Sequence, residues 1–243
     1  MPRIIVTILR LFFRLRMKTR PLQSGDRDAA AKLLADQFAY REPLTRQLGL
    51  SSSELLPLIS AHIDHCAAGN LGVVALRRDG VMLGVITAED DYRPFVPPEQ
   101  LLTPRLRMVG EVLGRVNLPP AWSPDSEGEL FYCDLAATDP KIADKHVLAA
   151  LTLGIFDHMT ARGFKRGYAK VTNPRMIERL RGFERLLGCP IFTVICSYRD
   201  PVGNVVTAVG WSLDFLAGFF RHINFSWRLP ARVSFTTLRE SKR

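Results

Sequence analysis

The sequence predicts an α/β domain in which a mixed sheet carries helices on both of its faces. Three observations lead to this class. Apolar runs of strand length alternate with segments of helical periodicity, two pairs of apolar runs flank short turn sequences, and helix start signals precede the helical segments. The 243 residues are 47% hydrophobic and 23% charged, which is typical of one large globular domain.

The elements follow one another in an order that fits this class. Strands are predicted at 17–22, 71–76, 81–87, 130–137, 167–172, 191–198 and 205–211. Helices are predicted at 26–40, 51–68, 104–116, 139–162 and 175–187. A proline-rich insert at 92–128 contains the third helix. The order is therefore strand-helix-helix-strand-strand, the insert, then strand-helix-strand-helix-strand-strand.

Local signals justify the ends of these elements. Ser24 or Asp26 can cap the first helix, and Ser51-Ser-Ser-Glu54 is a capping box for the second. Asp139-Pro140 predicts an N-cap and the first residue of the fourth helix, and Gly188 closes the fifth. The turn sequences 78–80 and 200–204 predict two hairpins.

Basic residues collect at the two ends of the chain. Residues 1–20 hold six basic side chains and no acid, and residues 221–243 hold six basic side chains and one acid. Together they exceed the net charge of +9, so residues 21–220 carry a small net negative charge. This distribution argues against a nucleic-acid-binding domain and favours tails that contact an anionic surface.

The chain accordingly divides into a basic amphipathic extension at 1–16, a domain at 17–213 and a basic aromatic tail at 214–243. One helical face of the extension is apolar and the other is basic, a pattern typical of a helix lying on a membrane surface. The alternative is that residues 1–16 are a disordered leader from an upstream start codon, since Met17 would begin a complete domain. We expect residues 1–16 to gain helicity on anionic vesicles only, and their deletion to reduce vesicle co-sedimentation.

Cysteine and histidine spacing gives no clear metal site. The four cysteines form no CxxC pair, which favours free thiols in a reducing, cytoplasmic setting. His62, His65 and Cys66 share a helix face, but no second ligand pair is evident, so no metal is predicted. No apolar run is long enough to span a membrane, so any membrane contact would be peripheral.

The segment from Phe38 to Gly49 contains Glu42-Pro-Leu and Leu48-Gly. It resembles the corresponding segment of insect arylalkylamine N-acetyltransferases and related bacterial proteins of the GNAT acyltransferase superfamily. The resemblance extends over 17–213 and implies a mostly antiparallel sheet, splayed between the strands at 130–137 and 167–172. It also implies that Glu42 is the general base that deprotonates an amine. The other interpretation is that Glu42 caps a helix–helix turn.

The strand at 130–137 and the helix after it resemble the GNAT element that binds acyl-CoA. The resemblance places the pantetheine arm along Leu135, Ala136 and Ala137, and the phosphates near three basic residues, Lys141, Lys145 and His146. The glycines usual in that loop are missing. The resemblance therefore implies that the donor is acetyl-CoA or a longer acyl-CoA bound in another pose, or an acyl-carrier protein. The other interpretation is that Lys141 and Lys145 form the solvated first turn of an ordinary helix.

The end of the domain resembles the last GNAT motif less closely. Its asparagine, which the resemblance assigns to cofactor binding, falls on Asn173, but Phe183 stands where the usual tyrosine donates a proton to the departing thiolate. Tyr168, Tyr198 and Cys189 are the alternatives for that role. The sequence thus predicts an amine N-acyltransferase with Glu42 and Tyr168 as catalytic residues, or else a GNAT-fold binding module with weak or no activity.

Overall fold

The computed structural model describes residues 17–142, 145–187, 190–200, 203 and 205–213. They form a seven-stranded sheet of order β1-β2-β3-β4-β5-β7-β6. The strands are β1 (Met17–Pro21), β2 (Gly72–Arg77), β3 (Met82–Asp90), β4 (Leu130–Thr138), β5 (Arg166–Val171), β6 (Thr193–Arg199) and β7 (Val205–Ser212). Strands β4 and β5 run parallel, and all other neighbouring pairs run antiparallel. The predicted mixed, mostly antiparallel sheet is therefore confirmed.

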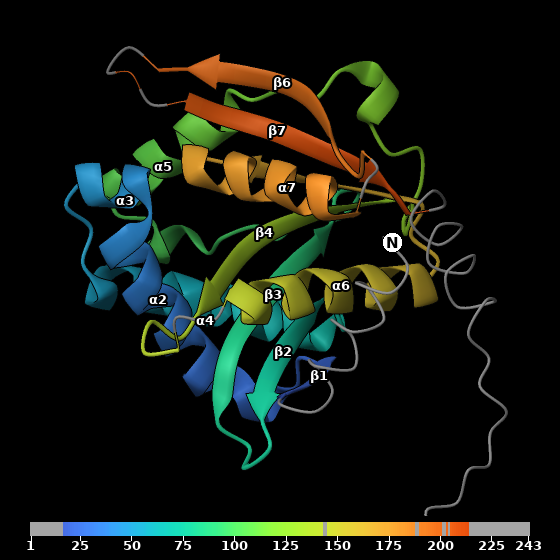
Figure 1. The fold of residues 1–243 in the computed structure, drawn as a ribbon. Helices are drawn as coiled ribbons and strands as arrows, with labels where there is room; N and C mark the ends of the chain where they lie inside the picture. Colours follow the sequence, from blue (N-terminus) through green and yellow to red (C-terminus); the bar gives the residue numbers. More distant parts are fainter. Residues whose placement is uncertain (1–16, 143–144, 188–189, 201–202, 204, 214–243) are drawn as a thin grey trace, which may run out of the picture.

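Helices cover both faces of this sheet, as predicted. They are α2 (Arg27–Arg41), α3 (Pro43–Gln47), α4 (Ser52–Ala68), α5 (Pro104–Gly114), α6 (Lys145–Ala161) and α7 (Pro174–Leu187), with short 3-10 turns at Ser24–Asp26, Glu99–Leu101 and Pro120–Trp122. In Figure 1, α6 crosses in front of β2 and β3, whereas α4 lies behind them. Helices α2 and α4 pack against each other and against β3.

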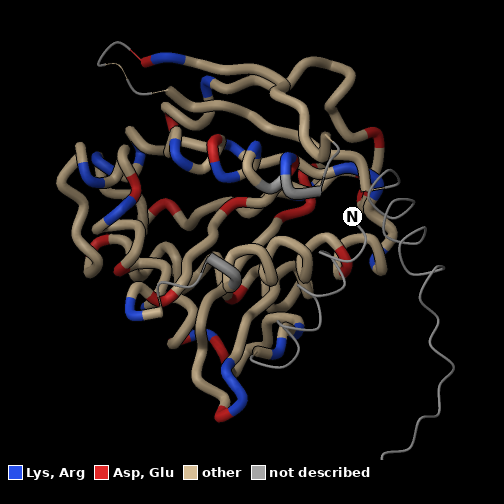
Figure 2. The backbone as a smooth tube through the Cα atoms, viewed as in Figure 1, with Lys and Arg blue, Asp and Glu red and all other residues tan. Residues whose placement is uncertain are grey.

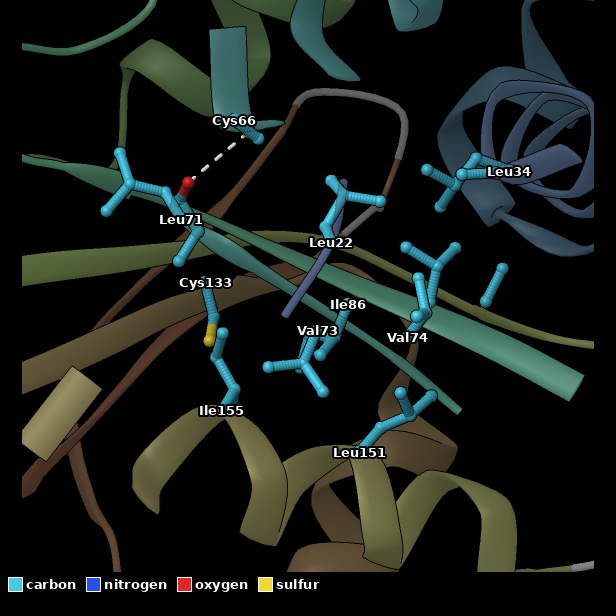
Figure 3. Packing of buried hydrophobic residues seen from close by; sticks show 14 of the residues in the cluster. Leu22, Leu34, Cys66, Leu71, Val73, Val74, Ile86, Cys133, Leu151 and Ile155 are labelled. Carbon is cyan, nitrogen blue, oxygen red and sulfur yellow. Dashed lines mark hydrogen bonds between the residues drawn. The ribbon is translucent and has the colours of Figure 1, made fainter. Parts of the chain in front are cut away.

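Buried apolar side chains fill the space on either side of the central strands. Figure 3 shows Leu151 and Ile155 of α6 pointing toward Val73 and Cys133 of the sheet, with Leu34 of α2 on the other side. Leu34, Leu151 and Ile155 are fully buried. A strand with apolar partners on both faces needs a continuous apolar run, which is why β2 and β3 were recognisable in the sequence.

The Ser51–Glu54 capping box and the N-cap position of Asp26 are confirmed, whereas the predicted helix start at Asp139 is wrong. Asp26 makes no side-chain hydrogen bond to the first turn of α2; its carboxylate accepts from the Arg20 guanidinium at 2.6 and 2.7 Å and from the Gln23 backbone N–H, which caps the preceding 3-10 turn. Asp139 accepts from the Lys141 backbone N–H at 2.9 Å within a turn, and the described part of α6 begins only at Lys145. Short acidic side chains bond to whichever donor the local backbone brings nearest, so a cap and a turn look alike in sequence.

The Arg20–Asp26 pair gives a testable pH dependence. Burial raises the pKa of Asp26, but the Arg20 and Gln23 hydrogen bonds outweigh it and leave a net lowered pKa. The stability that the carboxylate contributes is therefore present above its unfolded pKa of about 3.9 and is lost as the pH falls through the folded value. We expect Asp26→Asn to cost about 1–3 kcal/mol at pH 7 and almost nothing at pH 2. Urea denaturation at both pH values measures the difference; an equal loss at both would contradict it.

The two basic tails, 1–16 and 214–243, lie outside the described residues, so membrane contact stays a prediction. None of the described helices combines the length and the apolar character needed to cross a bilayer. Figure 2 shows basic and acidic residues interspersed along the described chain. This distribution agrees with the near-neutral body inferred from the sequence.

Candidate active site where two strands separate

Strands β4 and β5 diverge half-way along their length. Residues Leu130–Cys133 pair with Arg166–Ala169, and no pairing between the two strands follows among the described residues. Strand β5 instead continues its pairing with β7 as far as Val171, and β4 continues with β3 as far as Thr138. The sheet is thus open between the second half of β4 and the end of β5, so the predicted splay is confirmed.

A β-bulge in β4 lies at the start of this opening. Ile86 faces Ala136 and Ala88 faces Cys133, so the single residue Thr87 of β3 stands opposite both Asp134 and Leu135. The Thr87 hydroxyl accepts from the Leu135 N–H at 3.2 Å and lies 3.3 Å from the Leu135 carbonyl oxygen, which stabilises the bulge. Bulges of this kind redirect side chains. Here it is Asp134 that lies at the mouth of the opening.

Asp134 belongs to a buried group of ionisable side chains centred on His62. His62 comes from α4, and its two ring nitrogens lie near different carboxylates. Nδ1 is 3.2 Å from Oε1 of Glu89, and Nε2 is 3.5 Å from Oδ2 of Asp134. Nε2 also lies 3.1 Å from the Thr87 hydroxyl and 3.3 Å from the Cys66 sulfur. The ring packs edge-on against Phe95.

These contacts shift the ionisation of the group. Burial opposes protonation of His62, but hydrogen bonds with Cys66 and Glu89 and the charge of Asp134 outweigh it and raise the His62 pKa well above its ordinary value. Burial raises the pKa of Asp134, and the positive charge of His62 works against that rise. Burial also raises the pKa of the Cys66 thiol, which therefore stays protonated. The group therefore places His62, with its raised pKa, between two buried carboxyl groups.

A second pair of groups lies beside the first, where β5 begins to separate from β4. The Tyr168 hydroxyl donates to Asp91 at 2.5 Å, and the Tyr168 ring stacks on Tyr132 with 4.8 Å between centroids. Lys170 lies over the Tyr132 ring and donates to the Leu113 carbonyl oxygen. Burial raises the pKa of Tyr168, and hydrogen bonding to Asp91 adds to this, so the phenol keeps its proton at neutral pH.

Glu42 is the N-cap of α3. Its two carboxylate oxygens accept from the backbone N–H groups of Leu44 and Thr45 at 3.1 and 2.5 Å. The segment after α3 is tied to α5, because Arg105 donates to the carbonyls of Leu48 and Gly49. The capping interpretation is therefore realised, and the role of Glu42 as general base stays a prediction.

The structure brings only some of the other predicted site residues together. Leu135, Ala136 and Ala137 follow the bulge in β4, and Tyr168 lies on β5. Asn173 instead accepts from the Arg175 N–H at the start of α7. Lys141 is exposed in the turn before α6, the side chains of Lys145 and His146 lie outside the described part of the structure, and so does Cys189. Tyr198 lies on β6, with its hydroxyl accepting from Arg115.

Sequence reasoning did not identify His62, Glu89 or Asp134 as one group. Two signals were present: an acid within the apolar run of β4, and a run of three acids, Glu89-Asp90-Asp91, at the end of β3. Ligand atoms of His62, Glu89 and Asp134 lie within 4.8 Å of one another, close enough for a metal ion. Glu89 and Asp134 nevertheless lie at different ring nitrogens, and a single ion binds only one of these, so the arrangement fits ion pairs better.

Comparison with known proteins settles the fold. No protein-family model and no curated protein matches the sequence. Arylalkylamine N-acetyltransferase 2 from Aedes aegypti superimposes with a TM-score of 0.60 at 15% identity, over 81% of this chain and 99% of that one. The chain has the GNAT fold. The yncA acetyltransferase of Salmonella typhimurium, solved with its cofactor acetyl-CoA, gives 0.51 at 14% identity, over 82% of this chain and 94% of the other.

A third structure extends the comparison. The C-terminal condensation domain of Ebony, solved in complex with beta-alanyl-dopamine, superimposes with a TM-score of 0.65 at 12% identity. It covers 81% of this chain and 98% of the Ebony domain. At such identities the likeness establishes the fold, and the chemistry has to be argued from the residues of this chain.

Proposed function

We propose that this protein is an N-acyltransferase that moves an acyl group from a thioester donor to a primary amine at the opening between β4 and β5. The observation that carries the proposal is the position of Asp134, a half-buried carboxylate at the point where the sheet opens. The strand edge after it, Leu135–Ala137, lacks a β5 partner and can hydrogen-bond to a pantetheine arm. The amine acceptors in the names of the neighbouring structures support an amine here.

In the proposed reaction the amine nitrogen attacks the thioester carbonyl and loses a proton to Asp134. The C–N bond forms, the C–S bond breaks, and the departing thiolate takes up a proton. An amine is mostly protonated at neutral pH, so a carboxylate that accepts its proton accelerates the step. Burial raises the pKa of Asp134, which makes it a stronger base than an exposed carboxylate. Tyr168, which keeps its proton, is the proposed donor to the thiolate.

Glu42 is the second candidate for the base, from its resemblance to the insect enzymes. Glutamine at this position keeps one oxygen that can cap α3 but cannot take a proton. If Asp134 is the base, Glu42→Gln should lower kcat less than tenfold and cost about 1 kcal/mol of stability through the weakened cap. A fall of 10²-fold or more in Glu42→Gln, with Asp134→Asn nearly unaffected, would assign the base to Glu42 instead.

The donor is a pantetheine thioester, carried by coenzyme A or by a carrier protein. Two backbone N–H groups in the turn before α6 are already used, because Lys141 donates to the Asp139 side chain and Ile142 to the Asp139 carbonyl. A carboxylate in this turn also disfavours a diphosphate. The turn therefore favours a donor whose binding depends little on a diphosphate. An acyl-carrier protein is such a donor.

Thermal shift and product analysis test the proposal together. Purified protein is titrated with acetyl-, octanoyl- and palmitoyl-coenzyme A and with the matching pantetheine thioesters, then incubated with arylalkyl amines and agmatine. We expect at least one thioester to raise the melting temperature and mass spectrometry to detect the amide. Binding without amide formation from any amine would favour the alternative, a GNAT-fold binding module. No binding of any thioester would exclude both.

A further inference from the structure

We infer that His62 is a positioning residue for the acyl transfer: clamped between Glu89 and Asp134, it holds Asp134 as a carboxylate that faces the opening. The inference rests on the proposed function, since Asp134 is the group that takes the proton there. His62 itself is buried. Its side chain is 4% exposed, whereas the side chain of Asp134 is 20% exposed and is the part of the group that solvent reaches.

The two carboxylates at the ring nitrogens favour a charged imidazole ring. Each ring nitrogen lies close to a carboxylate, with Glu89 at Nδ1 and Asp134 at Nε2. A neutral imidazole has only one N–H, so one nitrogen would present its lone pair to an acidic oxygen. Only the imidazolium can donate in both directions. The Thr87 hydroxyl lies 3.1 Å and the Cys66 sulfur 3.3 Å from Nε2, and the ring tautomer decides which partner donates in these contacts; the contact with Glu89 lies at the other nitrogen.

Glu89, on the side of His62 away from Asp134, is fixed in place. Glu89 is 8% exposed and accepts with its second oxygen from the Phe95 N–H at 3.0 Å. His62 is held by this carboxylate and by its place on α4, above the bulge residue Thr87. The ring is therefore oriented from the protein side, and its Nε2 is presented to Asp134. This is how a buried carboxylate commonly orients a functional histidine.

Among the described residues, His62 has the largest positive-charge effect on Asp134. From α4, Cys66 contacts Nε2 as a neutral thiol, and His65 lies against Phe95 on the same side. From β4 and β5 come the neutral Tyr132 and Tyr168, and beyond them Asp91 and Lys170. Burial lowers the pKa of Lys170, and Asp91 lies next to it, so its influence on Asp134 is weaker than that of His62.

Opposite changes to the two ends of the clamp should shift the pH dependence of catalysis in opposite directions. His62→Gln removes the positive charge, so Asp134 should become harder to ionise. The acid limb of kcat/KM should then move up by about 1–3 pH units, with much of the activity recovered at high pH. Glu89→Gln removes a negative charge from the other end, and the acid limb should move down. His65→Gln, one residue before Cys66 on the same helix, is the control and should leave the limb in place.

The pH profiles separate positioning from a purely structural role. A structural role would lower kcat/KM in both variants and leave the acid limb where it is in the wild type, which would overturn the inference. A shift of the acid limb in the same direction in His62→Gln and Glu89→Gln would overturn it as well. If the wild type forms amides and Asp134→Asn is inactive, but the acid limbs of His62→Gln and Glu89→Gln stay where they are in the wild type, the inference about His62 fails and the proposed function stands. If no thioester and amine react at all, the proposed function fails with it.

A measurement on the unmodified protein covers the case in which a variant does not fold. The two ring nitrogens of His62 are observed by ¹⁵N NMR, with the resonance assigned by its loss in His62→Gln or by selective labelling. The inference predicts two protonated nitrogens at pH 8, where an ordinary histidine with a pKa of about 6.5 is neutral. A neutral His62 ring at pH 8 would overturn the inference.

Discussion

Asp134→Asn is expected to lower kcat at pH 7 by about 10²–10⁴-fold while leaving the donor-induced thermal shift intact. Asparagine keeps the size of the side chain and its ability to accept a hydrogen bond, but it cannot take up a proton. General-base catalysis by a positioned carboxylate is typically responsible for an effect of this size. The defect should shrink as the pH rises, because a growing fraction of the amine is then already deprotonated.

The matched control for this variant is Asp28→Asn. Asp28 lies in the first turn of α2 with 94% of its side chain exposed, and it should show neither a loss of kcat nor a change in donor binding. Equal turnover by the wild type and Asp134→Asn would remove Asp134 from the reaction. A loss of the donor-induced shift would instead mean that Asp134 contributes to binding.

Gly167→Ala is expected to lower the free energy of unfolding by about 3 kcal/mol. A Cβ atom at Gly167 would lie 2.4 Å from two ring atoms of Phe131 and 2.5 Å from the indole nitrogen of Trp211, both in the buried core. Phe131 is held in turn by Phe164 and Trp211, so neither ring can move freely. Overpacking in such a core typically costs 1–3 kcal/mol, and this site is at the upper end of that range.

Gly110→Ala provides the comparison. Gly110 is inside α5, and a Cβ there meets nothing within 4 Å, so alanine should raise the stability by up to about 1 kcal/mol through helix propensity. Urea denaturation of both variants measures the two effects. Similar stabilities for the two variants would mean that β5 shifts to accept the extra methyl group.

The two candidate bases differ in how their carboxylates are used. Glu42 satisfies N–H groups at the start of α3, which fixes its place in the fold. Asp134 has one oxygen near His62 and lies where the strands separate. A loop motif that resembles a catalytic one therefore need not contain the residue that takes the proton. The paired variants Glu42→Gln and Asp134→Asn show which of the two carboxylates is the base.

The sequence by itself determined the order of the elements, the two hairpins, the capping box at Ser51 and the buried strand from Leu130. Each of these depends on residues within one or two turns of each other, so short-range periodicity and turn chemistry are enough to specify them. The resemblance in the segments around Glu42 and Leu135 then supplied the splayed GNAT-like sheet, and the separation of β4 from β5 confirms it.

Only the tertiary structure decided which polar residues meet. His62, Glu89 and Asp134 come from α4, β3 and β4, and they converge because Thr87 faces two residues of β4 instead of one. A shift of one residue in a strand turns its side chains to the opposite face, so this bulge fixes where Asp134 lies. No local pattern in the sequence specifies a bulge between two strands more than 40 residues apart. The imidazolium clamp, and with it the candidate base, therefore emerges only in the folded chain.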